Sequence, residues 1–267
     1  MATPAPVFVS TYGRTAVRGQ ETVILVHGAG MDQSVWLLQG RYLAFHGWNA
    51  LAVDLPGHGR SKAQPVLTSI PAMADWLAEL IASIDQGPAT LIGHSMGALA
   101  SLCTAARHPE RVARLCLLGA AASMPVHPAL LELTAAGDPK GVGLICDWAF
   151  GTRAQLGGNA QPGGWLVGTA KSLLLRGSEA VLDSDLRACA AYADGPADAA
   201  RVRCPTLLVL GSDDKMTPAK GGYALAKLIP GARTVEIQEA GHMMMVETPE
   251  AVREALTGFL RAPSPAT

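Results

Sequence analysis

Ser95 lies between two glycines in the stretch Ala89–Ala100, ATLIGHSMGALA. The residues before the serine suit a buried strand, and the apolar residues after it recur at helical spacing. A chain that leaves a strand and enters a helix so abruptly turns sharply, and glycine at positions 93 and 97 avoids side-chain collisions there. The pattern G-x-S-x-G is typical of a nucleophile elbow, in which the serine hydroxyl stands clear of the sheet. A strand-to-helix turn with an incidental serine is the alternative interpretation.

A serine hydroxyl is a weak nucleophile without a base, an acid that orients the base, and an anion site. His242, in the stretch AGHMMMVETPE, is the candidate base because it follows the last predicted strand and precedes the last helix. A capping or core histidine is the alternative for this position. Two other histidines, His27 and His94, lie in glycine turns, where we expect their side chains to brace loops. The remaining histidines lie in a turn (His58) or in ordinary helix-end and loop settings (His46, His108 and His127).

The candidate acid is Asp213 or Asp214, in the stretch GSDDKMTP. A loop that directly follows a strand can carry a carboxylate to a histidine ring and select its tautomer. One of the two carboxylates could instead cap the helix that begins near Pro218. We prefer Asp214, since it lies farther along the loop and therefore has the longer reach.

The anion site requires two N–H donors. Met96 follows the serine at the start of a helix, where the helix dipole favours negative charge. Ala29, in the loop HGAGMDQSVW after the first core strand, is the natural second donor because glycines on both sides let the backbone approach a ligand. A dinucleotide-binding turn is the alternative for Gly28–Gly30, but position 33 is Gln where that pattern needs a third glycine.

Short apolar runs alternate with amphipathic stretches along the chain. Helices are predicted over 68–84 and 247–260, where apolar residues recur on one face. Such alternation predicts a mostly parallel, doubly wound α/β sheet covered by helices on both faces. Buried strands are predicted at 22–28, 49–59, 89–95, 114–121, 205–214 and 233–242. Every candidate catalytic group follows one of these strands, at the edge where open α/β sheets place their sites.

Residues 122–200 interrupt this alternation, since they contain helical segments and a glycine-rich loop (156–165) but no convincing buried strand. An insertion of this size between two core strands is often functional, for example as a lid. We therefore predict a core of residues 1–121 and 201–267, and an inserted helical cap at 122–200. Trp148, Phe150 and Trp165 could line an apolar acyl pocket beneath it, or could pack the cap onto the core.

Composition narrows the function classes. The chain of 267 residues is 49% hydrophobic and 16% charged, which allows a large core and argues against disorder. A net charge of −1 without a basic stripe argues against nucleic acid as a partner. Five scattered cysteines without metal-ligand spacing suit reduced thiols in the cytoplasm. The sequence shows no apolar run long enough to span a membrane and no signal-peptide pattern, so we expect a cytoplasmic protein without membrane association.

Together these motifs resemble the α/β-hydrolase superfamily over nearly the whole chain. The matching stretches are HGAG, DLPGHGRS, GHSMG, GSDDKMTP and AGHMMMVETPE, in the family's order of serine, acid and histidine. In the family the acid falls in a G-x-x-D-x-x-x-P pattern, which here selects Asp214 between Gly211 and Pro218. The resemblance also implies that the insertion is the family's helical cap. Its five basic and eight acidic side chains give it a net charge of −3, which does not attract strongly anionic substrates.

Several relatives with this fold are disfavoured by single residues. Dehalogenases and epoxide hydrolases use aspartate as nucleophile, hydroxynitrile lyases carry lysine where this chain has Met243, and proline iminopeptidases usually show GGSWG. The remaining resemblance, to small esterases, enol-lactonases, carbon–carbon bond hydrolases and haloperoxidases without a cofactor, implies hydrolysis of a small ester, thioester or lactone. No metal or cofactor is implied. A ligand sensor with slow turnover, and an acyltransferase or perhydrolase with the same triad, are the alternatives.

Overall fold

The computed structural model of the chain describes residues 7–84, 86–158 and 164–262. Its centre is a seven-stranded sheet with the order β1-β3-β2-β4-β5-β6-β7, in which β1 is antiparallel to β3 and the other neighbours are parallel. The strands are β1 (Val9–Ser10), β2 (Thr22–Val26), β3 (Asn49–Val53), β4 (Ala89–His94), β5 (Val112–Leu118), β6 (Thr206–Gly211) and β7 (Arg233–Ile237). The predicted mostly parallel α/β sheet is confirmed.

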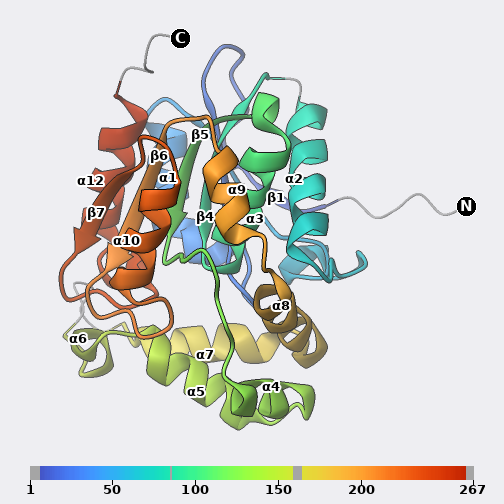
Figure 1. Cartoon of the computed structure of the whole chain (residues 1–267), viewed down its shortest axis with the longest axis vertical. Coiled ribbons are helices and arrows are strands. Elements are labelled where there is room, and N and C mark those ends of the chain that lie inside the picture. The colour runs from blue at the N-terminus through green and yellow to red at the C-terminus, as the bar shows by residue number, and fades with distance from the viewer. Residues whose placement is uncertain (1–6, 85, 159–163, 263–267) are drawn as a thin grey trace, which may run out of the picture.

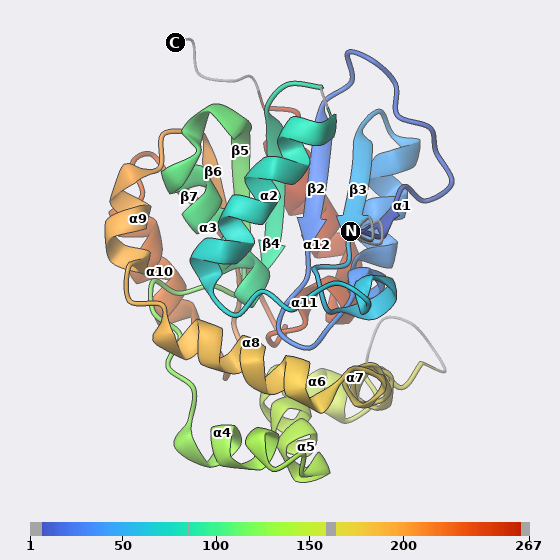
Figure 2. The ribbon, with the colours of Figure 1, turned by 90° about the vertical axis from the view of Figure 1, so that its right-hand side faces the viewer.

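Helices cover both faces of this sheet. The side chains of β2 alternate between two apolar clusters: Ile24 faces the side covered by α2, α3 and α10, while Leu25 faces the side covered by α1 and α12. Figures 1 and 2 show these two helical layers around the sheet. The helices of this core are α1 (Leu37–Phe45), α2 (Ile70–Ile84), α3 (Met96–Arg107), α10 (Ala219–Leu228), α11 (Met244–Glu247) and α12 (Pro249–Leu260).

The predicted strands and helices extend a few residues beyond those in the structure. The predicted strand 49–59 ends at Val53, and the predicted strand 233–242 ends at Ile237. Both segments end where the parallel partner stops pairing, and the residues after Ile237 form the loop that carries His242. The antiparallel strand β1 has two residues and no hydrophobic pattern, so the sequence did not predict it.

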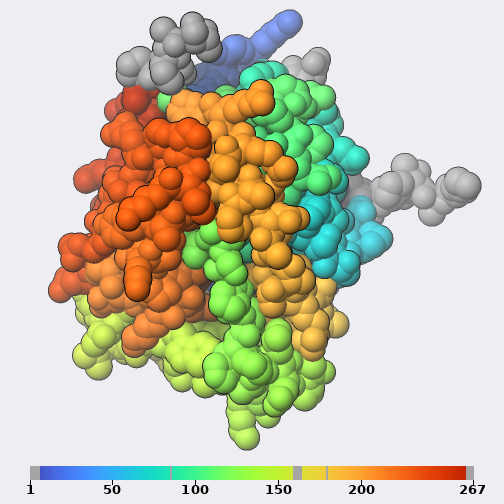
Figure 3. Space-filling view, viewed as in Figure 1, coloured from blue at the N-terminus to red at the C-terminus, as the bar shows by residue number. Residues whose placement is uncertain are grey.

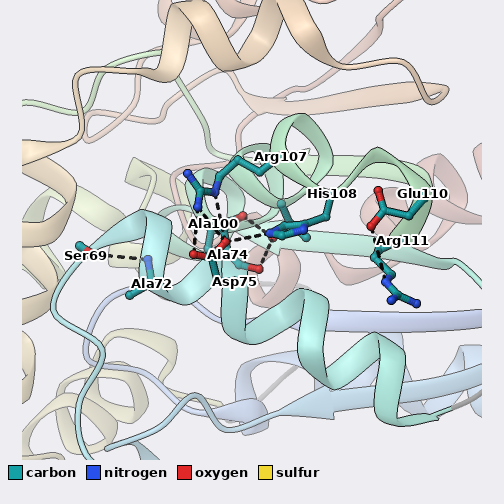
Figure 4. A network of polar contacts seen from close by, with 10 residues as sticks. Ser69, Ala72, Ala74, Asp75, Ala100, Arg107, His108, Glu110 and Arg111 are labelled. Carbon is teal, nitrogen blue, oxygen red and sulfur yellow. Dashed lines mark hydrogen bonds and ion pairs between the residues drawn. The ribbon is translucent and has the colours of Figure 1, made fainter.

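A polar network joins α2 to the end of α3 on the outer surface (Figure 4). The Arg107 guanidinium donates to both carboxylate oxygens of Asp75, and His108 Nε2 lies 2.8 Å from one of them. The hydrogen bond with His108 is the main reason why the pKa of the Asp75 carboxyl is lowered. Because the pair is exposed, we attribute most of the helix packing to the apolar residues beneath it.

The helices from α4 to α8 of the inserted segment 122–200 lie across one end of the sheet, whereas α9 lies beside the sheet (Figures 1 and 2). The arrowhead of β2 in Figure 2 points toward α8, so the carboxyl ends of the parallel strands face these helices, and at the bottom of the molecule Figure 3 shows the first helices of this segment. Its helix α9 packs against α3 and α10. Its helices are α4 (Pro128–Ala135), α5 (Pro139–Ala149), α6 (Thr152–Gln155), α7 (Leu166–Arg176), α8 (Glu179–Ala191) and α9 (Gly195–Arg201). Residues 159–163 of the predicted glycine-rich loop lie outside the described residues.

The cysteines are free thiols, of which four are buried and Cys204 is half-buried. Burial raises the pKa of every one of them, so they remain protonated and unreactive. Among the described helices, none has both the length and the apolar character needed to cross a lipid bilayer.

Candidate active site

Ser95 occupies a strained turn between β4 and α3. Its backbone has a φ of 53° and a ψ of −117°, a conformation that residues with a side chain rarely adopt. The Ser95 N–H donates to the Leu118 carbonyl oxygen at 3.0 Å, which anchors the turn to β5. Such strain persists only where the surroundings enforce it, and it is concentrated at functional sites.

The two glycines that flank this turn are required by backbone contacts. A Cβ atom on Gly93 would lie 2.2 Å from the Gly97 carbonyl oxygen, and a Cβ atom on Gly97 would lie 2.4 Å from the Val26 carbonyl oxygen. Both contacts involve main-chain atoms of the sheet or the elbow, which cannot rotate away. The glycines therefore allow α3 to start directly against β2 and β4.

We expect Gly97→Ala to destabilise the fold by about 1–3 kcal/mol, because the new methyl group overlaps the backbone of β2. Gly258→Ala is the matched control: Gly258 lies in α12, and a Cβ atom there would meet nothing within 4 Å. That variant should be stabilised by about 0.5–1 kcal/mol, since alanine favours the helix. Urea unfolding of both variants measures the difference, and equal stabilities would contradict the steric argument.

The structure places His242 and Asp214 in direct contact, although they come from different loops. His242 Nδ1 lies 2.8 Å from Asp214 Oδ2, and both side chains are buried. Burial by itself would raise the pKa of the Asp214 carboxyl, but the charge and hydrogen bond of His242 and the donors of Thr217 outweigh it and lower that pKa. Asp214 is therefore an anion at neutral pH.

This contact selects the histidine tautomer. A carboxylate can only accept hydrogen bonds, so the proton of neutral His242 resides on Nδ1. The Nε2 atom is left with a lone pair, and it has no hydrogen-bond partner among the described residues. Nε2 is thus in the state required of a base that accepts a proton from a serine hydroxyl.

The neighbouring carboxylate, Asp213, has no such contact in the described chain. Its side chain is half-buried and accepts from the Ser212 hydroxyl at 3.3 Å. Asp214 is held by Thr217, which sequence reasoning missed: its backbone N–H donates to Oδ1 at 2.8 Å, and its hydroxyl donates to Oδ2 at 2.7 Å. The position of Thr217 inside the GSDDKMTP motif is the signal that could have identified it.

Two further buried side chains hold the His242 loop. His94 Nε2 donates to the His242 carbonyl oxygen at 2.9 Å, and burial lowers the pKa of His94 to about 3, so its ring is neutral. Glu247 Oε2 accepts from the N–H groups of Gly151 and Gly241 at 2.9 and 3.2 Å, and thereby ties this loop to the inserted segment. Sequence reasoning assigned His94 to loop bracing but gave Glu247 no role.

The candidate anion site lies next to Ser95. Ala29 lines the same cavity as Ser95 and His242, and a Cβ atom on the preceding Gly28 would lie 3.3 Å from the Ser95 Cβ atom. The Ala29 N–H has no acceptor among the described residues. Met96 is the first residue of α3, where the N–H groups have no intrahelical acceptor. The two predicted donors are therefore both available.

A cavity of about 450 Å³ opens over these residues. Its floor comes from the core, and most of its walls come from the inserted segment. The lining is mainly apolar. Among the described lining residues, Lys215 is the one that is a lysine, arginine, aspartate or glutamate. The lining residues are Ala29, Met31, Ser95, Met124, Pro125, Val126, His127, Leu130, Ile145, Trp148, Leu182, Leu186, Cys189, Lys215, Met216, Thr217 and His242.

The three aromatic residues predicted for the pocket have different positions. Trp148 lines the cavity, Phe150 is fully buried in the core cluster, and the Trp165 side chain is 71% exposed. Neither Phe150 nor Trp165 belongs to the described cavity lining. Elsewhere in the described chain, no group of three or more His, Cys, Asp or Glu side chains could hold a metal ion.

The chain is similar to known hydrolases in sequence and in fold. Residues 23–255 match the sequence model described as the alpha/beta hydrolase family. The chain is 34% identical to pimeloyl-(acyl-carrier protein) methyl ester esterase of Neisseria meningitidis serogroup A, over 91% of this chain and 78% of the relative. It is 26% identical to (E)-2-((N-methylformamido)methylene)succinate hydrolase of Acinetobacter baylyi, over 90% of both chains. The enol-lactonase of Burkholderia xenovorans superposes with a TM-score of 0.83 over 96% of both chains, at 23% identity, which shows a common fold.

Proposed function

The chain belongs to the alpha/beta hydrolase family, and from that premise we propose that it is a serine hydrolase that cleaves a small ester, thioester or lactone through an acyl-enzyme. The contact between Asp214 and His242 carries this proposal, because it leaves the Nε2 lone pair free in the cavity that Ser95 lines. Relatives named as an esterase and a hydrolase support the reaction class.

In the proposed reaction Ser95 Oγ attacks the carbonyl carbon while its proton passes to His242 Nε2. The carbonyl π electrons move to the oxygen, which the N–H groups of Ala29 and Met96 stabilise. The bond to the leaving group then breaks, the leaving group takes the proton from Nε2, and the acyl group remains on Ser95. Water repeats the sequence, gives its proton to His242, and releases the carboxylic acid with regeneration of Ser95.

We propose that residues 122–200 act as a cap that controls which substrates enter, while residues 1–121 and 201–267 carry the catalytic groups. The cavity wall supports this division, since α4, α5 and α8 supply Leu130, Ile145, Trp148 and Leu186. An apolar wall of this kind suits an uncharged acyl chain, because burial of apolar surface drives its binding.

Intact-protein mass spectrometry during turnover of a short aryl ester tests the acyl-enzyme. We expect an acyl adduct that maps to Ser95. Added alcohol or hydrogen peroxide separates the related reactions: a transferase or perhydrolase would form the new ester or peracid faster than the free acid. A ligand sensor would form the adduct but complete few turnovers.

We expect Trp148→Ala to shift acyl-chain preference toward longer esters, since loss of the indole enlarges the cavity. The ratio of kcat/KM for octanoyl to acetyl ester should rise by about tenfold or more, as is usual for a few methylene groups in an apolar pocket. Trp165→Ala is the matched control, because this exposed tryptophan is outside the described cavity lining. An unchanged ratio in folded Trp148→Ala would contradict a role in acyl selection.

A further inference from the structure

A buried carboxylate from the inserted segment reaches the candidate anion site. Asp185 lies on α8 and is 0% exposed. Its Oδ2 atom accepts from the Gly30 N–H at 2.8 Å and lies 2.8 Å from His58 Nε2. Gly30 directly follows Ala29, so a side chain of the insertion binds the backbone next to the candidate oxyanion donor.

The helices of the insertion also pack closely on this loop. A Cβ atom on Gly30 would lie 2.7 Å from a methyl carbon of Leu182 and 3.1 Å from one of Leu174. Gly30 has a φ of +66°, which glycine tolerates better than other residues. The glycine thus serves two purposes: it permits the turn, and it lets α8 approach until Asp185 can bind the loop backbone.

His58 completes the contact through both ring nitrogens. Its Nε2 faces the Asp185 carboxylate, and its Nδ1 lies 3.1 Å from the Pro56 carbonyl oxygen. Both neighbours only accept hydrogen bonds, so both ring nitrogens donate when the ring is protonated. Burial would lower the pKa of His58, but the hydrogen bond and charge of Asp185 outweigh it and raise that pKa. A protonated His58 neutralises a carboxylate that would otherwise oppose negative charge on a nearby oxyanion.

The neighbouring histidine is in the opposite state. His27 Nε2 accepts from the Leu55 N–H at 3.1 Å, and its Nδ1 lies 2.9 Å from the Gly28 carbonyl oxygen. Burial, together with the charge of His58, lowers the pKa of His27 well below its usual value, so the ring is neutral. The rings of His27 and His58 lie 4.8 Å apart. Among the described side chains, Asp185 is the titratable group that raises the pKa of His58. The charge of His58 in turn adds to the effect of burial in lowering the pKa of His27, and it opposes the increase that burial causes in the pKa of the partly buried Asp54 carboxyl.

We propose that Asp185 is a positioning residue for the hydrolytic reaction. By binding the Gly30 N–H it holds the loop Gly28–Met31 so that the Ala29 N–H points to the oxyanion, and it thereby couples the inserted helices to the anion site. This inference rests on the proposed function. This role differs from general helix packing, because Asp185 binds the backbone N–H of the residue that directly follows Ala29.

Three variants test this assignment by kcat and KM for a short aryl ester. In Asp185→Ala the loop loses its anchor, and kcat should fall about 10–100-fold with KM changed less than about threefold, as for a misplaced transition-state donor. Asp185→Asn should remain within about tenfold of wild type, because one amide oxygen can accept both hydrogen bonds that Oδ2 accepts. Asp183→Ala is the control, since Asp183 lies on α8 but binds Thr134 and Arg187 of the insertion.

Two further measurements distinguish positioning from simple helix packing. A trifluoromethyl ketone forms an anionic adduct on the serine, and its inhibition constant should rise in Asp185→Ala by the same factor as kcat/KM falls. NMR titration of the histidine rings should give His58 a pKa above the usual value of histidine in the wild type. In Asp185→Asn the pKa of His58 should be lower than in the wild type. A wild-type His58 that titrates like an exposed histidine would show that the buried pair does not form.

Wild-type kcat and inhibition constants in folded Asp185→Ala would overturn the assignment and leave the proposed function intact. A raised KM with unchanged kcat would also overturn it, because Asp185 would then act on substrate entry alone. If hydrolysis of the short aryl ester persisted in Ser95→Ala, the proposed function itself would fail.

Discussion

Ser95→Ala is expected to lower ester hydrolysis by about 10⁴–10⁶-fold, since removal of the nucleophile disables the whole catalytic unit. Folding should be preserved, because the Ser95 backbone makes the hydrogen bond to Leu118 and the methyl group of alanine fits where the serine Cβ lies. The measurement is kcat/KM on a short aryl ester, with the thermal unfolding midpoint as the check on folding. Ser83→Ala is the control, since the Ser83 hydroxyl is exposed and donates only to the Leu80 carbonyl oxygen.

A fluorophosphonate probe provides a second readout on the same residue. It should label Ser95 in the wild type and in Ser83→Ala, and it should leave Ser95→Ala unlabelled. Labelling at a different serine, or near-full activity in Ser95→Ala, would refute the proposed nucleophile.

Asp214→Asn is expected to lower kcat by about 10⁴-fold, because it would hold His242 in a tautomer that cannot act as a base. The backbone N–H groups of Met216 and Thr217 both donate to Oδ1, so the amide oxygen of asparagine takes that position. The NH₂ group then replaces Oδ2 and donates to His242 Nδ1, which forces the ring proton onto Nε2. A protonated Nε2 of a neutral ring cannot accept the proton of Ser95.

Asp213→Asn is the matched control for this prediction, because it removes the adjacent carboxylate, which has no contact with His242 among the described residues. Its kcat should stay within about twofold of wild type, because no interaction with the proposed catalytic groups is removed. If Asp213→Asn were the severe variant and Asp214→Asn the mild one, the catalytic acid would be Asp213. The hydrogen bonds between Thr217 and Asp214 would then stabilise the loop without serving catalysis.

Most of the sheet could be predicted because its buried parallel strands carry continuous apolar runs. The edge strand β7 is an exception, since its sequence RTVEI is mixed and mostly exposed, although the predicted segment 233–242 contains it. The strand ends were less predictable. The predicted segments continue past Val53 and Ile237 into residues that form turns, whereas a strand ends where its neighbour stops offering hydrogen bonds. The antiparallel β1 escaped prediction because two residues cannot show a period.

Ser95, Asp214 and His242 could be located from sequence for a local reason. Each lies in the turn or loop after a strand, so a strand assignment places it near the carboxyl edge of the sheet without any knowledge of packing. The local sequence pattern could not decide whether Asp213 or Asp214 is the acid. Only the position of Asp214 farther along the loop, and the resemblance to the family's motif, favoured Asp214 over Asp213. The contacts of Thr217 with both oxygens of Asp214 distinguish them, and these depend on how the loop folds back on itself.

Local periodicity and backbone sterics were therefore enough to predict the alternation of the main strands and helices, the elbow, and the edge of the sheet where the candidate groups gather. Which side chains of the insertion face the site depends instead on how its helices pack. Trp148 and Trp165 are both tryptophans of the insertion, yet Trp148 lines the cavity and Trp165 is exposed. Asp185 reaches Gly30 across 155 positions of sequence. Such contacts depend on the path and rotation of helices packed far from their partners in the chain, which no local pattern encodes.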